Sequence, residues 1–454
     1  MKYKKDWTER KMNMNPYSIK SVKARQVYDS RANPTVEVDI TLEDGSFGRG
    51  IVPSGASTGR FEVLELRDGG KSWDGKGVRN AIKNIKDKIA PKLIGMDVRK
   101  QKEIDEMMIA LDGSENKSVL GANAILGCSM AVCRAAAAYY DLPLYRYLGG
   151  AQANVLPVPQ VQIIGGGAHA NMAIDIQDFL VVPLSASNFE DSYEMVVNVY
   201  NAAKKVFTES GRPLSIADEG GFWPTNFKTN EEGVALLTES IKRAGYVPGK
   251  DMAIALDIAS SEFYNEEDGT YRLSLENRTL SREEFIDLLC EWVDKYPIIS
   301  IEDGASEMDW EGTKLLTERL GKRIQLIGDD LFTTNLSRIR KGIENGCANA
   351  VLIKMNQIGT ITETLEAIRY TQGQGYLPVV SARSGETEDD TIVHLAIATN
   401  AGQLKVGSAA RSERTVKWNE VIRIEEDMGK GGYYPADRIF TDAGLDIYSV
   451  GKSE

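Results

Sequence analysis

Apolar and polar residues alternate along residues 18–52, in three short runs that place apolar side chains at every second position. The runs read IKSVKARQVYD, TVEVDITL and FGRGIV, and the last two flank a turn at Glu43-Asp44-Gly45-Ser46. Alternation on both sides of an Asp-Gly turn is typical of a β-hairpin. We therefore expect an antiparallel sheet at the start of the chain.

The spacing of apolar residues then changes to that of amphipathic helices. One helix is indicated by Val78, Ile82, Ile85 and Ile89, and a second by Ile104, Met107, Met108 and Leu111. A sheet backed by helices predicts an α+β domain over residues 18–150, preceded by a leader at 1–17. The break at Leu148-Gly149-Gly150 marks its expected end.

From residue 151 to 454 the pattern is a repeated strand and helix. Short apolar runs end in polar or charged residues and alternate with amphipathic helices; the runs are IALD, IISIED, IQLIGDD, AVLIK, LPVVSARS and LKVGS. Two helices are expected to begin with capping boxes, at Thr229-x-x-Glu232 and Ser281-x-x-Glu284. Such alternation predicts a parallel sheet, and the number of units favours closure into a β/α barrel. The expected fold class is therefore α/β.

Composition and charge exclude several classes of protein. The 454 residues are 42% apolar and 26% charged, a balance typical of a globular chain, and the net charge is −12. No basic stripe is present, so we expect no nucleic-acid partner. A small anionic substrate would need metal ions or a few lysines and arginines placed close together.

The remaining features of the composition point to a cytoplasmic protein that does not enter a membrane. The four cysteines have no zinc-like or CxxC spacing, which favours reduced, buried thiols. The N-terminus lacks the apolar core of a signal peptide. The longest apolar run, from Ala122 to Tyr140, is interrupted by Arg134 and is interpreted as a core helix of small residues. His394, within TIVHLAIATN, is assigned a structural role in a packed helix.

Acidic residues end three successive strands of the predicted barrel, at Asp257, Glu302 and Asp329. The C-terminal ends of barrel strands face one common site, and three carboxylates there need a neutralising charge. Mg²⁺ suits such oxygen ligands and leaves positions for water and substrate. A single strand-end aspartate more often caps a loop or pairs with an arginine. Three of them, followed by two lysines, favour a metal site.

Two lysines, Lys354 and Lys405, lie at or within later strands. A partly desolvated lysine near another cation has a lowered pKa and can act as a general base, although most lysines simply extend to solvent. With metal ions present, the set suggests removal of a proton α to a carboxylate, with the metals stabilising the enolate. Arg383-Ser384-Gly385 and the Gly/Ser loop at 53–59 could hold a phosphate, although such loops are often only turns.

At this point the residues match a known family. From Ser18 to Glu426 the chain resembles enolase, through DSRANPTVEV, VPSGASTG, KSVLGANAILG, GGAHA, DEGGF, ALDIASSEFY, SIEDG, DWEG, GDDLFTTN, LIKMNQIGT, RSGETED and RSER. The resemblance implies an N-terminal α+β domain, a modified eight-stranded β/α barrel, two Mg²⁺ ions and a homodimer or larger ring. It also implies a small phosphorylated acid as substrate.

The resemblance assigns roles to individual residues. It implies that Asp257, Glu302 and Asp329 bind the first Mg²⁺ and that Ser57, in the loop at 53–59, binds the second and lies at the substrate. It implies that Lys354 is the base.

The resemblance also assigns the groups that contact the substrate. It implies that Lys405 lies beside the substrate carboxylate and that Glu219 is the acid that assists loss of the C3 hydroxyl. His169, Arg383 and Ser384 match the groups around the phosphate.

The departures from the family pattern are concentrated in one half of the site. Ala382 replaces a histidine, and Asp178, which we count among the catalytic groups, replaces a glutamate and withdraws its carboxylate by about 1.5 Å. The family's MNIINGG becomes Gln160–Gly166 without either asparagine, and Trp223 adds bulk after DEGGF. The half that abstracts the proton is thus intact, while the half that expels hydroxide is rebuilt.

Three hypotheses follow. The first is an enolase that interconverts 2-phosphoglycerate and phosphoenolpyruvate. The second is a repurposed paralogue acting on a phosphorylated or phosphonylated acid, such as carboxyphosphonoenolpyruvate synthase of phosphonate biosynthesis. The third is a catalytically silent scaffold or surface-binding protein, which would have no reason to keep the carboxylates and lysines.

Overall fold

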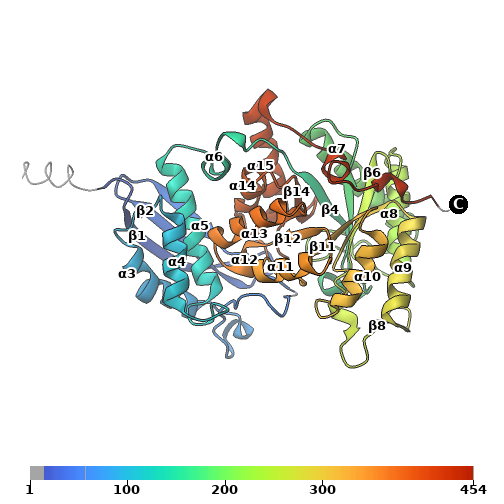
Figure 1. Cartoon of the computed structure of the whole chain (residues 1–454), viewed down its shortest axis with the longest axis horizontal. Coiled ribbons are helices and arrows are strands. Elements are labelled where there is room, and N and C mark those ends of the chain that lie inside the picture. Colours follow the sequence, from blue (N-terminus) through green and yellow to red (C-terminus); the bar gives the residue numbers. More distant parts are fainter. Residues whose placement is uncertain (1–14, 57, 453–454) are drawn as a thin grey trace, which may run out of the picture.

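The computed structural model describes residues 15–56 and 58–452, which form a small sheet-and-helix part beside a large barrel (Figure 1). The small sheet contains β1 (Ile19–Tyr28), β2 (Pro34–Leu42) and β3 (Phe47–Ile51), all antiparallel. The predicted hairpin around the Asp-Gly turn is therefore confirmed.

The helix α5 (Ala122–Tyr139) covers this sheet and is almost entirely buried. Glycines on β3 allow its close approach, because a Cβ at Gly48 would lie 2.2 Å from the carbonyl oxygen of Ala131 on α5. The apolar run expected to be a core helix of small residues is thus confirmed. Around it lie α2 (Arg79–Asn84), a π-helical turn (Ile85–Ile89), α3 (Ala90–Leu93), α4 (Gln101–Asp112) and α6 (Leu144–Gly149).

The large part is a closed eight-stranded barrel, in the order β10-β11-β12-β13-β14-β4-β5-β6. Its strands are β4 (Val158–Gly165), β5 (Asp178–Pro183), β6 (Met252–Asp257), β10 (Ile298–Glu302), β11 (Gln325–Gly328), β12 (Ala350–Ile353), β13 (Leu377–Ser381) and β14 (Gln403–Ser408). Each of the six apolar runs picked out in the sequence covers all or most of one of these strands.

One strand runs against the predicted direction. β5 is antiparallel to both of its neighbours, β4 and β6, whereas the other pairings in the barrel are parallel. The chain between β4 and β5 holds only a 3-10 turn, η4 (Gly167–Ala170), so no helix carries it back across the sheet. A parallel connection needs such a crossover. The expectation of a fully parallel sheet is therefore wrong at β5.

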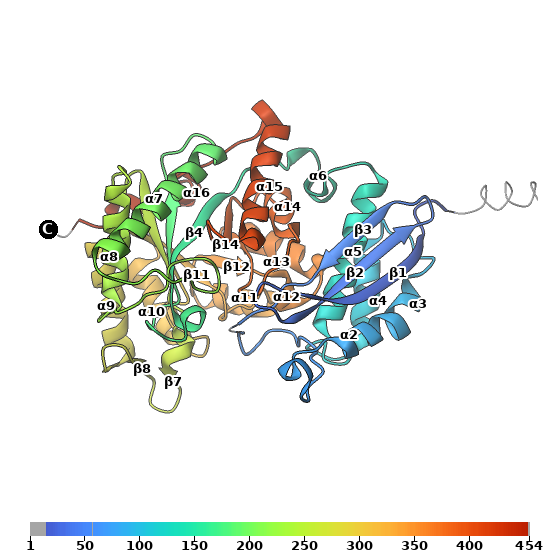
Figure 2. The same cartoon turned by 180° about the vertical axis from the view of Figure 1, so that it is seen from behind.

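Helices surround the barrel (Figure 2). They are α7 (Phe189–Glu209), α8 (Glu231–Arg243), α9 (Arg282–Lys295), α10 (Trp310–Leu320), α11 (Leu336–Glu344), α12 (Met355–Ile358), α13 (Ile361–Gly373), α14 (Thr391–Ala398), α15 (Ser412–Met428) and α16 (Arg438–Thr441). A small sheet of β7 (Tyr264–Asn265), β8 (Thr270–Leu273) and β9 (Arg278–Leu280) projects from one end. Among the described residues, no helix combines the length and apolar character needed to cross a membrane.

The two expected capping boxes have different outcomes. Ser281 accepts from the backbone N–H of Glu284, and the Glu284 side chain accepts from the N–H of Ser281, so α9 begins with a complete box. At α8 the N-cap position is Asn230, and no side chain caps the helix. Glu232 instead binds Arg212 and the N–H of Lys228, so the capping box predicted at Thr229 is wrong.

Candidate active site

Charged side chains gather where neighbouring strands of the barrel end. Asp257 and Glu302 are the last residues of the paired strands β6 and β10, where they are register partners, and Asp329 follows β11 directly. Lys354 follows β12, and Lys405 lies inside β14. All five side chains are largely buried. The structure therefore brings together the acidic and lysine residues that the sequence placed at strand ends.

Lys405 joins two of the carboxylates. Its Nζ lies 2.8 Å from Asp257 Oδ2 and 2.7 Å from Glu302 Oε2, and 3.7 Å from Asp178 Oδ2. Burial opposes the charged ammonium, but Asp257 and Glu302 outweigh it and raise the pKa of Lys405 well above its ordinary value. The Lys405 ammonium therefore lies between two carboxylates, where its positive charge offsets theirs.

Lys354 contacts the third carboxylate, through an ion pair between its Nζ and Asp329 Oδ2. Gln357 donates to the other oxygen of Asp329 at 2.8 Å. Burial lowers the pKa of Lys354, but the charge of Asp329 outweighs it, and the net direction is upward. The sequence predicted a lowered pKa for Lys354, and with the side chains of the protein alone this prediction is wrong. A lowered pKa would require another cation to offset the charge of Asp329.

The acidic residues fit a divalent cation. Glu302 Oε1 is buried and has no hydrogen-bond partner among the described residues. Burial, followed by the neighbouring charge of Asp257, raises the pKa of Glu302 well above its usual range. An orphaned carboxylate oxygen beside two further carboxylates is a donor set that hard cations such as Mg²⁺ prefer. Asp257, Glu302 and Asp329 are therefore our candidates to hold one, beside the cluster of Asp303, Asp329 and Asp330, whose carboxylate oxygens lie within 4.8 Å of one another.

Asp303 positions the loop that carries Asp329. Its two carboxylate oxygens accept from the backbone N–H groups of Asp329 and Asp330, at 2.9 and 2.8 Å. Asp303 has a left-handed backbone conformation, with φ of 42°, which is uncommon for residues other than glycine. The strand end is therefore held in a local geometry that aims Asp329 into the site.

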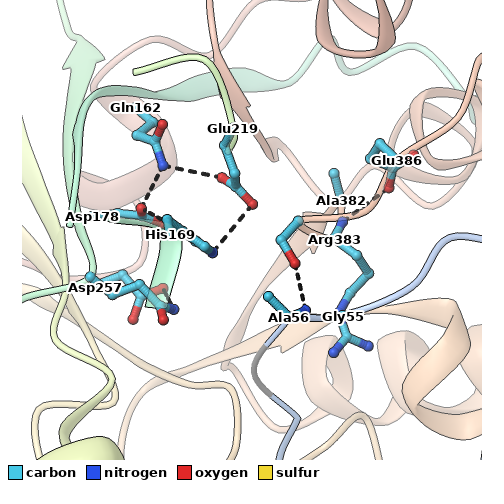
Figure 3. A network of polar contacts seen from close by, with 12 residues as sticks. Gly55, Ala56, Gln162, His169, Asp178, Glu219, Asp257, Ala382, Arg383 and Glu386 are labelled. Carbon is cyan, nitrogen blue, oxygen red and sulfur yellow. Dashed lines mark hydrogen bonds and ion pairs between the residues drawn. The ribbon is translucent and has the colours of Figure 1, made fainter. Parts of the chain in front are cut away.

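A second group of polar side chains lies beside Asp257 at the cavity (Figure 3). His169, on η4, places Nδ1 3.0 Å from Asp178 Oδ1 and Nε2 3.8 Å from Glu219 Oε1. Burial lowers the pKa of His169, but the charges of Asp178 and Glu219 outweigh it and raise the value to about 9. Burial likewise opposes ionisation of Asp178, yet the charge of His169 lowers its pKa overall. The network thus contains a charged imidazole beside an ionised carboxylate.

The third side of the cavity is formed by Arg383 and Ser384, after β13. The Arg383 guanidinium lies 3.0 Å from Glu62 and donates to Asn356 Oδ1 at 2.8 Å. Ser384 Oγ accepts from the N–H of Ala56 at 2.6 Å, which ties the Gly/Ser loop to this edge. Ser57 lies outside the described residues. Arginine, hydroxyl and loop N–H groups are thus close together, as phosphate binding requires.

The cavity between these groups is lined by His169, Gln177, Asp178, Glu219, Asp257, Lys354, Ser381, Ala382, Arg383, Ser384, Lys405, Val406 and Gly407. Ala382, where the family has histidine, faces this space. Trp223 is not among the lining residues, so the bulk expected near Glu219 lies outside the cavity. His394 lies apart, buried on α14, as expected for a structural residue.

Several residues of the site were not found from the sequence. Glu62 pairs with Arg383, Gln357 binds Asp329, and Gln162 contacts both Asp178 and Glu219. Glu62 follows the VPSGASTG stretch by three residues, and Gln357 lies within LIKMNQIGT, three residues after Lys354; neither carries another signal. Gln162 was noticed only within a segment that had lost its asparagines, and the alternation along β4 does not indicate which inward residue reaches the site.

Known proteins match nearly the whole chain. A family model described as "Enolase, N-terminal domain" matches residues 19–148, and one described as "Enolase, C-terminal TIM barrel domain" matches residues 153–443. The protein named Enolase 1 of Desulfitobacterium hafniense (strain Y51) is 70% identical over 432 residues, which cover 95% of this chain and 99% of that protein.

Proposed function

The chain belongs to the enolase family, and from that premise we propose that it interconverts 2-phosphoglycerate and phosphoenolpyruvate with Mg²⁺ as cofactor. It is an enzyme, a lyase of the enolase superfamily. The observation that carries the finer proposal is the convergence of Asp257, Glu302 and Asp329 with Lys354 and Lys405 around one buried cavity. The similarity to the protein named Enolase 1 favours this reaction over that of a repurposed paralogue.

The proposed reaction begins with proton transfer from C2 of the substrate. Lys354, in its neutral form, takes this proton, and the electron pair left on C2 delocalises into the carboxylate, which Lys405 holds. Bound Mg²⁺, held by Asp257, Glu302 and Asp329, would neutralise charge and stabilise the enolate, and Ser57 is the proposed ligand of a second ion. Arg383 and Ser384 hold the phosphate.

Loss of water completes the reaction. The C3–O bond breaks, the hydroxyl leaves as water with a proton from Glu219, and the electron pair forms the C2–C3 double bond. Glu219 is supported in this role by its position among the residues that line the cavity, with Oε1 3.8 Å from His169 Nε2. His169 lies next to this acid, and Asp178 in turn contacts His169.

The experiment mixes the purified chain with 2-phosphoglycerate and Mg²⁺ and follows the conjugated enol by ultraviolet absorbance. A parallel sample in D₂O follows exchange of the α-proton. Turnover supports the proposal. Exchange without water loss would favour the repurposed paralogue, and absence of both would favour a silent scaffold.

A lysine variant tests the assignment of the base. We expect Lys354→Ala to lower both water loss and α-proton exchange by at least about a hundredfold, because general bases contribute effects of that order. Lys205→Ala, at an exposed position on α7, is the matched control and should leave both rates unchanged. Normal exchange in the Lys354 variant would contradict the assignment.

The remaining expectations concern location and assembly. We propose a cytoplasmic homodimer or larger homo-oligomer, on the strength of the family alone. Light scattering on the purified chain tests the assembly, and a mass equal to one chain would contradict it.

A further inference from the structure

Gln162 occupies a position between the two acids of the cavity (Figure 3). It lies on β4 and is fully buried. Its Nε2 donates to Asp178 Oδ1 at 2.6 Å and lies 3.3 Å from Glu219 Oε2. One neutral amide therefore reaches both carboxylates and uses both of its N–H groups to do so.

The orientation of this amide is set by the backbone. Gln162 Oε1 accepts from the N–H of Gly221 at 2.9 Å. Because this oxygen must face a donor, the NH₂ group must face the two carboxylates. Both ends of the amide are satisfied, which a buried polar group requires.

Two glycines leave the space that this side chain fills. A Cβ at Gly221 would lie 2.5 Å from Gln162 Oε1, and one at Gly165 would lie 3.2 Å from Gln162 Cδ. Larger residues at either position would displace the amide. The backbone around the cavity is therefore shaped to the length of this side chain.

The lengths of Gln162 and Asp178 are complementary. Gln162 carries two methylenes before its amide, and Asp178 carries one before its carboxylate. The longer amide reaches the shorter acid, which also binds His169 at 3.0 Å. The carboxylate is thus held from two sides at the position where a longer acid would otherwise extend.

We propose that Gln162 is a positioning residue for the elimination of water, because it sets the placement of Glu219 relative to Asp178. The inference rests on the proposed function, in which Glu219 protonates the leaving hydroxyl. Displacing a reacting group by about 1 Å can cost on the order of a hundredfold in rate. Among the described residues, the side chain of Gln162 forms its hydrogen bonds with Asp178, Glu219 and Gly221 and none with Lys354 or Asp329, so removal of the α-proton should depend on it much less.

The test compares Gln162→Met with Gln160→Met. Methionine keeps the approximate volume of glutamine and removes both N–H donors. Gln160 is the matched control, since it lies two residues earlier on β4, is equally buried, and donates to Gln403 instead of an acid. The readouts are kcat and KM for water loss from 2-phosphoglycerate and the rate of α-proton exchange in D₂O, with thermal unfolding to confirm the fold.

We expect Gln162→Met to lower kcat for water loss by about a hundredfold, with KM and exchange changed less than about threefold. Gln160→Met should change none of them. Equal losses of exchange and water loss, or no loss at all, would overturn the inference.

A rescue variant keeps the test decisive if Gln162→Met does not fold. Gln162→Asn shortens the amide by one methylene, and Asp178→Glu lengthens the acid by one. We expect kcat of the double variant to be at least tenfold higher than kcat of Gln162→Asn alone. Absence of this rescue would count against the inference. Wild-type protein without water loss would refute the proposed function and this inference together, whereas wild-type turnover with unaffected variants would refute this inference alone.

Discussion

At the scale of the residue, the site differs from the family pattern by one methylene at Asp178 and by one imidazole ring at Ala382. Asp178 is shorter than the acid that the family places there, yet Gln162 and His169 hold its carboxylate from both sides. Ala382 leaves open the part of the cavity where an imidazole would stand. These departures were visible in the sequence, but the compensation by Gln162 was not.

Restoring the family residues tests this account. We expect Ala382→His with Asp178→Glu to raise kcat for water loss, by about tenfold, because a placed proton-transfer group contributes at least that much. The gain should be larger when Gln162→Asn makes room for the longer acid. The ultraviolet assay compares the wild type with both combinations of substitutions, and an unchanged kcat would contradict the idea of a rebuilt half-site.

His394 provides a prediction on stability and pH. Burial lowers its pKa from 6.5 to about 4, while Asp390 only partly opposes this effect. The unfolded chain therefore binds more protons than the folded chain between these values, and stability falls as the pH drops from 6.5 towards 4. The full contribution is on the order of 3 kcal/mol.

Urea unfolding at pH 7, 6 and 5 measures this effect. The free energy of unfolding should fall less steeply with pH in His394→Asn than in the wild type, because the variant lacks the titrating group. Other ionisable groups are common to both proteins and cancel in the difference. Parallel curves for the two proteins would rule out the depressed pKa.

At the scale of the element, sequence motifs predicted the structure correctly where their hydrogen bonds form between residues that are close in the chain. Ser281 and Glu284 close a capping box within four residues. Thr229 and Glu232 have the same spacing, but Glu232 is drawn to Arg212, which is distant in sequence. A tertiary contact thus overrode a local motif. The direction of β5 was missed for a related reason, since the apolar pattern of a strand does not encode its direction.

The two capping positions form a matched pair for measurement. We expect Ser281→Ala to lower the free energy of unfolding by about 1 kcal/mol, the usual cost of a lost N-cap. Thr229→Ala should cost much less, because no side chain caps α8. Equal losses from the two variants, measured by urea unfolding, would contradict the difference between the helices.

At the scale of the whole molecule, closure of the barrel concentrates charge. Asp257, Glu302 and Asp329 end three neighbouring strands, β6, β10 and β11, and Lys405 on β14 reaches Asp257 and Glu302 because the sheet closes on itself. Lys405 and Lys354 offset part of their charge, and Glu302 Oε1 stays without a partner among the described residues. We propose that the folded protein has a site for a cation here, which the unfolded chain lacks.

A metal titration tests this consequence. A ligand that binds only the folded state stabilises it by about 2.7 kcal/mol at a hundred times its Kd. We expect Mg²⁺ to raise the Tm and EDTA to reverse the increase. In Glu302→Gln the Tm without Mg²⁺ should be no lower than in the wild type, because the substitution removes a buried charge that is only partly paired. The increase in Tm with Mg²⁺ should be lost in this variant. Equal increases in both proteins would place the cation elsewhere.

The sequence by itself determined the barrel, the small sheet and the strand-end charges. Each depends on short-range patterns: Asp257 and Glu302 end apolar runs, and the ends of barrel strands must face one site. The division near residue 150 and the roles of the individual residues remain predictions.

Only the tertiary structure decided the reversed direction of β5, the contacts of Gln162 and the raised pKa of Lys354. Each depends on groups distant in the chain. Gln162 meets Glu219 across 57 residues, and Asp329 acts on Lys354 through space. Hydrogen bonds and charge interactions follow distance in space, which the order of residues does not specify until the barrel has closed.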